Sequence, residues 1–394
     1  MTDTHVWKLT DEEIVALVQR VFQPRPSEKT LAILTDLPHR ADTDHADWQW
    51  RRQAVVTWAR QLDARREKTG WSPSLVVYRN VGANNADLPN TAWTVPAAVW
   101  RSQPLTGTVE EMEESQAEPF AGILGRHPIH IACTEFSATA PLKLAARQYN
   151  IRAATMPGFT ASMIPALRLD YTEINRRVFL LKELLDRAEK AEFVFVVDAD
   201  KEYRLTLDLR FRTAHASGGL LPESGTAGNL PSGEAYIVPY EGEKPGETSR
   251  SAGELPVQIG DDIVIHRIEN NRSIAVLGDN AAARDEAEHL KREPAYGNMS
   301  ELGLGVLGEL GVEPVGELLL DEKLGLHIAF GRSDHFGGQV GAAQFSGPEA
   351  VIHLDRVYVP SMQPRIRVRR VDLLMDDGCV QPLIRDDEYV VGFT

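Results

Sequence analysis

Five side chains in the second half of the sequence have the types and spacing of metal ligands. They are Glu234, Glu301, His327 and the pair His353 and Asp355, and we interpret the setting of each as a strand end or a turn. Two glutamates, two imidazoles and an aspartate form a mixed nitrogen and oxygen set. Such a set suits one or two borderline divalent ions and leaves positions free for water and substrate. Thiolates would close a structural zinc site, and the two cysteines of the chain are far apart. The pattern favours a catalytic metal centre.

Each of these residues also has an ordinary structural interpretation. Glu234 follows Pro-Ser-Gly, where a surface turn is common, and His327 lies between apolar residues, as a hydrogen-bonded core histidine would. His353 and Asp355 are two residues apart, so on a strand they share a face and would suit a simple hydrogen-bonded pair. Elsewhere, His127 and His130 flank the start of a strand, and we interpret both as structural.

The candidate ligands lie within motifs that resemble those of the aminopeptidase T and aminopeptidase S family of metal-dependent exopeptidases. Order and rough spacing agree over about 120 residues of the sequence. The matching motifs are Asn229-Leu-Pro-Ser-Gly-Glu234, Glu301-Leu-Gly-Leu-Gly305, Asp321-Glu-Lys323, His327-Ile-Ala-Phe-Gly331 and His353-Leu-Asp355. The resemblance implies that the five ligands hold two divalent ions, zinc, cobalt or manganese. It also implies an N-terminal α/β region, a C-terminal metal-bearing region and a homodimer.

The sequence departs from the family pattern at three places near the site. Val306-Leu307 stands where the family has Thr-Asn, and Gly325-Leu326 stands where it has Gly-Thr. A tyrosine that often follows the histidine of the fourth motif is missing from the stretch 332–338. If that tyrosine stabilises an oxyanion, the role is vacant or falls to His335.

The chemistry explains why such residues are needed. Two ions roughly 3.5–4 Å apart can share a water, lower its pKa and polarise a carbonyl oxygen. A bridging carboxylate such as Glu234 or Asp355 would hold the ions together. Amide hydrolysis also needs a group that carries a proton to the leaving amine, and Glu301 and Glu322 are both candidates.

Three function classes follow from this site. The first is a metal-dependent aminopeptidase or related amide hydrolase that acts on small peptides or peptide-like substrates. The second is a mononuclear non-haem Fe(II) ring-cleaving dioxygenase similar to the dihydroxypyridine dioxygenases, which would need only histidine and carboxylate ligands on one face of the ion. The third is a binding protein that holds no metal.

The composition of the chain disfavours some classes of binding partner and indicates a cellular compartment. The chain has 394 residues and a formal charge of −15, which disfavours nucleic acid and anionic membranes because the field of the molecule repels polyanions. The first residues show no cationic segment followed by an apolar run, so we expect no secretory signal. With two distant cysteines and no long apolar stretch, we expect a cytoplasmic protein.

The secondary-structure elements predicted along the chain show two different patterns. Short apolar runs at 31–35, 74–78 and 129–133 alternate with helical patterns at 47–68 and 140–149, which predicts a doubly wound α/β layer. After an amphipathic helix near 170–190 and a buried strand at 193–197, residues 205–211 alternate with a period of two, as antiparallel strands do. All seven tryptophans lie in the first hundred residues, which supports a boundary.

The predicted fold class is therefore α/β, with an N-terminal doubly wound domain over residues 1–200 and a β-rich α+β domain carrying the metal site over 201–394. We interpret 214–233 as a long ordered loop. Further strands are expected at 235–239, 262–268, 272–277, 326–330, 350–354 and 365–373, and a helix at 279–292.

Overall fold

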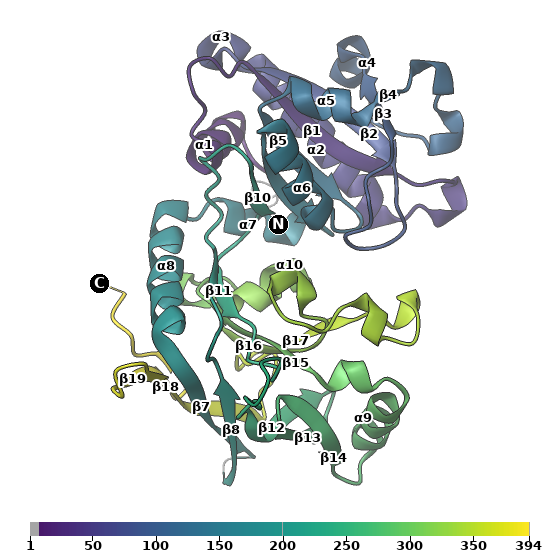
Figure 1. Cartoon of the computed structure of the whole chain (residues 1–394). Coiled ribbons are helices and arrows are strands. Elements are labelled where there is room, and N and C mark those ends of the chain that lie inside the picture. The colour runs from purple at the N-terminus through teal and green to yellow at the C-terminus, as the bar shows by residue number, and fades with distance from the viewer. Residues whose placement is uncertain (1–7, 199, 394) are drawn as a thin grey trace, which may run out of the picture. The chain divides into compact units, whose positions relative to one another are not determined.

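The computed structural model describes residues 8–198 and 200–393. Contacts within the chain divide it into two compact units. Figure 1 labels their helices and strands and colours the chain by residue number. The first unit contains the chain up to Glu173 together with Gly219–Ser232, and the second contains Ile174–Gly218 and the chain from Gly233 onward. The first is α/β and the second is a β-rich α+β unit, which confirms the predicted fold class.

The first unit is built on a seven-stranded sheet in the order β10-β6-β5-β1-β2-β3-β4. Its five strands from β10 to β2 are parallel, and β3 and β4 add antiparallel strands at one edge. The strands are β1 (Thr30–Leu37), β2 (Ser72–Arg79), β3 (Thr91–Val95), β4 (Glu118–Pro119), β5 (Ile129–Thr134), β6 (Arg152–Pro157) and β10 (Thr226–Asn229). The helices are α1 (Asp11–Phe22), α2 (Ala46–Ala64), α3 (Arg66–Thr69), α4 (Ala97–Ser102), α5 (Phe120–Arg126), α6 (Thr139–Tyr149) and α7 (Ile164–Leu167).

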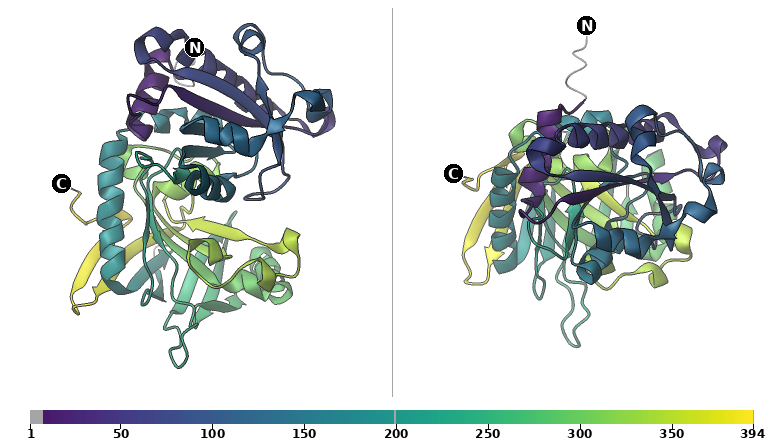
Figure 2. Two further views of the ribbon diagram at one scale, coloured as in Figure 1. Left: turned by 45° about the horizontal axis from the view of Figure 1, so that its top comes forward. Right: turned by 90° about the horizontal axis from the view of Figure 1, so that it is seen from above.

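Helices cover both faces of this parallel sheet (Figure 2). Alternate residues of β1, Ala32 and Leu34, pack with Phe120 of α5 and Leu142 of α6. The other β1 side chains point to the opposite face, where α2 packs on β1 and β2. This double covering is why the strands read as continuous apolar runs in the sequence.

Two predictions about the boundary differ from the structure. The contact boundary lies after Glu173 instead of after residue 200, because the helix α8 (Tyr171–Arg187) and the strand that follows pack with the second unit. The segment 214–233, predicted as a loop, contains two strands, β9 (His215–Ser217) and β10. β10 pairs in parallel with β6, and this pairing returns Gly219–Ser232 to the first unit.

The second unit has two antiparallel sheets. The larger has the order β14-β13-β12-β8-β7-β18-β19-β20, and the smaller, which carries the candidate site, has the order β17-β16-β15-β11-β9. The larger sheet contains β7 (Ala188–Val197), β8 (Lys201–Asp208), β12 (Ala252–Ile259), β13 (Asp262–Glu269), β14 (Arg272–Leu277), β18 (Ile366–Met375), β19 (Val380–Arg385) and β20 (Glu388–Tyr389). The smaller contains β9, β11 (Glu234–Ile237), β15 (Met299–Gly305), β16 (Leu326–Gly331) and β17 (His353–Val357).

The helices of the second unit are few. Apart from α8, they are α9 (Ala281–Arg292), which packs on β13 and β14, and the single-turn α10 (Leu318–Asp321). Within the described residues, no helix combines the length and the apolar character needed to cross a bilayer.

Candidate metal centre

The candidate ligands lie on one face of the five-stranded sheet. Glu301 on β15 pairs with Ala329 on β16, and Ala329 pairs with Asp355 on β17. Directly paired residues point to the same side of a sheet, so Glu301 and Asp355 share a face. His327 is two residues from Ala329 on β16 and projects from the same face.

The other two candidates reach this face from the ends of their strands. Glu234 begins β11 and pairs with Gly305, which is two residues from Gly303 and four from Glu301 on β15. His353 begins β17 and pairs with Gly331. All five predicted ligands are thus brought together, although Glu301 and Asp355 lie inside strands and not at a strand end or turn.

A glycine on β15 makes room for the first imidazole. Gly303 is the cross-strand partner of both Tyr236 and His327. A Cβ atom at position 303 would lie 1.8 Å from the Nε2 atom of His327. The absence of a side chain therefore lets the imidazole lie across β15, toward the carboxylates on either side.

The five side chains form two clusters that share one carboxylate. Glu234, Glu301 and His327 form the first cluster, and Glu301, His353 and Asp355 form the second. The Oε1 atom of Glu301 lies 3.3 Å from the Nε2 atom of His327, and its Oε2 atom lies 3.3 Å from the Nε2 atom of His353. The Oε2 atom of Glu234 lies 3.6 Å from the Nε2 atom of His327, and the Oδ1 atom of Asp355 lies 3.6 Å from the Nε2 atom of His353.

Backbone carbonyls fix the orientation of both imidazoles. The Nδ1 atom of His327 is 3.2 Å from the carbonyl oxygen of Gly325, and that of His353 is 2.8 Å from the carbonyl oxygen of Arg332. A carbonyl only accepts, so each Nδ1 carries the proton and donates it. The Nε2 atom is thereby directed at the carboxylates, as is usual for a metal-bound histidine.

The electrostatics of the centre are dominated by these acid–imidazole contacts. Burial would raise the pKa of Glu301, but hydrogen bonds from His327 and His353 outweigh it and hold the pKa well below the usual range. Burial would lower the pKa of His327, yet the hydrogen bond to Glu301 and the charges of Asp355 and Glu234 raise it to about 9. The same balance raises the pKa of His353 well above its ordinary value.

A fully buried lysine, Lys323, contacts the first cluster. Its ammonium lies 3.1 Å from the Oε1 atom of Glu234 and also binds Glu322. Glu234 thus has one oxygen engaged by the lysine and the other, Oε2, directed at His327. Burial raises the pKa of Glu322 to about 8; Lys323 opposes this shift, while Glu234 and Asp355 add to it.

His335 lies beside the centre and not among the ligands. Its ring centroid is 5.4 Å from that of His353, and its Nδ1 atom is 3.5 Å from a carboxylate oxygen of Asp334. Burial, with the nearby charges of His353 and Arg332, lowers the pKa of His335 to about 4. The ring of His335 therefore lies beside the second cluster.

The donor set fits divalent ions. A tetrahedral ion with bonds of 2.0–2.1 Å spaces its ligand atoms by roughly 3.3 Å, close to the 3.3–3.6 Å separations between the imidazole nitrogens and the carboxylate oxygens. The shared Glu301 offers a different oxygen to each cluster. That the five side chains bind ions stays a prediction.

Sequence reasoning assigned no role to two residues of this face. Lys323 stands in one of the quoted motifs, and only the fold shows that its side chain is buried against Glu234. Tyr236 follows Glu234 by two residues on β11, so the period of the strand was a signal for a neighbour on the same face. Burial, with the charges of Glu301 and Glu234, raises the pKa of Tyr236 well above its ordinary value.

Comparison with known proteins gives a fold and no family. No protein-family model and no curated protein matches the sequence. The structure is similar to that of wild-type AmpT, an aminopeptidase T, from Thermus thermophilus, with a TM-score of 0.54 and 14% identity over 97% of this chain and 98% of that one. It is also similar to the 2,5-dihydroxypyridine dioxygenase from Pseudomonas putida KT2440, with a TM-score of 0.58 and 14% identity over 98% and 99% of the two chains. At 14% identity, these similarities show the fold alone.

Proposed function

We propose that this protein is a metal-dependent hydrolase that removes the N-terminal residue of small peptides or cleaves a related amide bond. The observation that carries the proposal is the sharing of Glu301 between two three-residue clusters. Two adjoining sites with a common carboxylate suit a pair of divalent ions, whereas a single ion would not need both outer carboxylates, Glu234 and Asp355. The fold similarity to AmpT adds support.

The proposed roles follow from the contacts. Glu234, Glu301 and His327 would hold one ion, and Glu301, His353 and Asp355 the other. Bound ions of this kind lower the pKa of a shared water and polarise a carbonyl oxygen. Lys323 holds one oxygen of Glu234 and leaves the other directed at His327, which orients this ligand.

A proton must move from the attacking water to the leaving amine. Both oxygens of Glu301 face imidazoles, so we assign the proton transfer to the carboxylate of Glu322, which Lys323 holds in place. The water oxygen bonds to the carbonyl carbon, the carbon–nitrogen bond breaks, and Glu322 delivers the water proton to the amine nitrogen. As a neutral imidazole, His335 still carries one ring N–H, which it would donate to the developing oxyanion.

The second candidate is a mononuclear Fe(II) ring-cleaving dioxygenase. The structural similarity to the 2,5-dihydroxypyridine dioxygenase favours it. His327, His353 and one carboxylate would provide the facial set that such an iron needs. In this reading Glu234 is neutralised by Lys323 and holds no metal.

Metal analysis with a substrate screen separates the candidates. The hydrolase proposal predicts two zinc, cobalt or manganese ions per chain and cleavage of aminoacyl amides or short peptides that a chelator abolishes. If the protein instead holds one oxygen-sensitive iron per chain and consumes oxygen with dihydroxylated aromatic compounds, the hydrolase proposal is wrong and the dioxygenase is favoured. Absence of metal after reconstitution would support a binding protein instead. The homodimer and the cytoplasmic compartment stay predictions, and light scattering tests the dimer.

A further inference from the structure

The segment between β16 and β17 brings aromatic rings to the metal centre. A short 3-10 helix over Asp334–Phe336 carries His335 and Phe336. The ring of Phe336 lies 5.4 Å from that of His353 in the second cluster and 4.9 Å from that of Tyr236, both nearly edge-on. Phe336 thus connects the strand that bears Glu234 with the strand that bears His353 and Asp355.

The pairing of β9 with β11 adds a further ring to this group of aromatic side chains. Tyr236 lies on the ligand face of β11, and its cross-strand partner on β9 is His215. The two rings stack with centroids 5.1 Å apart and an angle of 26°. The Nε2 atom of His215 is 3.0 Å from the carbonyl oxygen of Phe336, which ties the segment to β9. The wall therefore consists of His215, Tyr236, Phe336 and His335 beside the candidate ligands.

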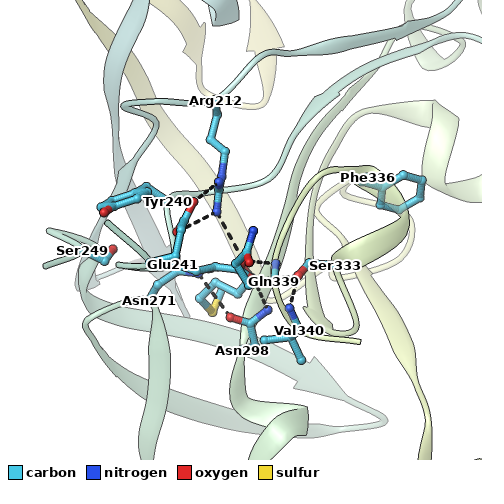
Figure 3. Close-up of polar contacts among 12 residues, drawn as sticks. Arg212, Tyr240, Glu241, Ser249, Asn271, Asn298, Ser333, Phe336, Gln339 and Val340 are labelled. Carbon is cyan, nitrogen blue, oxygen red and sulfur yellow. Dashed lines mark hydrogen bonds and ion pairs between the residues drawn. The ribbon is translucent and has the colours of Figure 1, made fainter. Parts of the chain in front are cut away.

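One buried carboxylate, that of Glu241, holds the base of this segment (Figure 3). Its Oε1 atom accepts hydrogen bonds from Ser333 Oγ at 2.6 Å and from Asn298 Nδ2 at 2.8 Å. Its Oε2 atom accepts from the backbone nitrogen of Gln339 and from Arg212 Nη2 at 3.2 Å. Four donors converge on a side chain that is 6% exposed, and two of them belong to the segment that carries Phe336.

We propose that the wall formed by Phe336 and Tyr236 selects substrates whose side chain next to the reacting carbonyl is a flat aromatic ring, and that Glu241 is the positioning residue of this wall. The inference deepens the proposed function and rests on it for the identity of the reacting group. Aromatic rings prefer offset or edge-to-face contact with other rings, and a saturated ring of equal size lacks the quadrupole that favours it. The expected discrimination is about three- to tenfold.

Binding of non-hydrolysable amino acids tests this selection directly. Isothermal titration of the metal-loaded protein with L-phenylalanine and with L-cyclohexylalanine compares a flat ring with a puckered ring of similar size. We expect phenylalanine to bind about three- to tenfold more tightly. The Phe336→Leu variant keeps apolar volume and should lose that ratio. Equal dissociation constants in the wild type, or no binding of either compound, would overturn the inference.

The role of Glu241 is tested with a matched pair of variants. Glu241→Gln replaces one accepting oxygen by a donor, so two of the four hydrogen bonds fail and the ratio should fall toward one. Glu243→Gln removes the other acidic partner of Arg212 but makes no contact with the segment, so it should keep the wild-type ratio. A Glu241→Gln protein that is folded, by its thermal melt, and keeps the full ratio would exclude the positioning role.

The outcome is separable from that of the proposed function. If phenylalanine is preferred but no amide is cleaved, the aromatic wall stands and the hydrolase proposal fails. If amides are cleaved with equal kcat/KM for phenylalanine and cyclohexylalanine substrates, the hydrolase stands and the aromatic selection fails.

Discussion

Two pairs of buried histidines, one in each unit, show how different surroundings give the same residue opposite properties. In the first unit His127 and His130 lie with ring centroids 6.2 Å apart, and burial lowers the pKa of both, that of His130 to about 3. In the second unit the side chain of His327 is 1% exposed and that of His353 is 18% exposed, yet the pKa values of both are raised because carboxylates face them. Among the described residues, no ion pair joins His127 or His130 to a carboxylate, whereas His327 and His353 both face Glu301.

The difference teaches that a buried histidine becomes a candidate ligand through its neighbours and not through its burial. The Nε2 atoms of His327 and His353 both face Glu301, and their Nδ1 atoms are held by backbone carbonyls. His130 sits among the apolar strands of a parallel sheet, where a neutral imidazole is the favoured state.

Removing the shared carboxylate should have the largest effect. Glu301→Gln takes away an anionic ligand from both clusters, so we expect the metal content to fall below one ion per chain and hydrolysis to fall by about a thousandfold, or about 4 kcal/mol. Elemental analysis and amide hydrolysis measure both. Glu286→Gln is the control, because Glu286 is a buried carboxylate of the same unit that binds Arg356 and Tyr296 instead. Full metal occupancy in Glu301→Gln would remove this residue from the site.

Crowding one imidazole should have the next largest effect. Gly303→Ala places a Cβ atom where the Nε2 atom of His327 now lies, so the ring must move away from Glu301 and Glu234. We expect the affinity of the first cluster for its ion to fall by about 10- to 100-fold. Titration with zinc and a competing chelator measures it. Gly122→Ala, whose Cβ would meet nothing within 4 Å, should leave both affinities unchanged.

His130 should affect the dependence of stability on pH and should have no effect on metal content. The unfolded chain binds a proton at His130 near pH 6.5, whereas the folded chain resists it down to about pH 3. The free energy of unfolding is therefore unaffected by His130 above pH 6.5. Below that pH it decreases, by about 3 kcal/mol at pH 4.5, because the unfolded chain binds a proton that the folded chain does not. His130→Leu should gain stability relative to the wild type over this range in urea unfolding. Parallel stability curves would show that His130 does not titrate on unfolding.

The smallest effect on metal is expected at a buried histidine of the second unit that lies outside the clusters. Burial, then the charge of Arg356, lowers the pKa of His266 to about 3, and its Nδ1 atom is 3.0 Å from Ser273 Oγ. His266→Gln should cost about 1–2 kcal/mol of unfolding free energy. Metal content and hydrolysis should both stay within about twofold of the wild type. A loss of metal in His266→Gln would contradict the view that facing carboxylates distinguish the candidate ligands from other buried histidines of the second unit.

The sequence was sufficient for those features that depend on local pattern. The strand predicted at 272–277 coincides with β14, and the helix predicted at 140–149 differs from α6 by one residue. The strand predicted at 350–354 was wrong by three residues, since β17 begins at His353.

Features that depend on distant neighbours could not be predicted in this way. β10 was missed because its four residues have no apolar run and form a strand only by pairing with β6. The five candidate ligands were found through their motifs, whereas the contacts of Lys323 and Glu241 arise between segments far apart in the chain.

The most direct test of the account is anomalous X-ray diffraction from crystals grown with zinc. The account predicts two anomalous peaks roughly 3.5–4 Å apart, one on each side of the Glu301 carboxylate, the first in contact with His327 and the second with His353. A map with no peak within bonding distance of Glu301, from crystals grown with excess zinc, would contradict it.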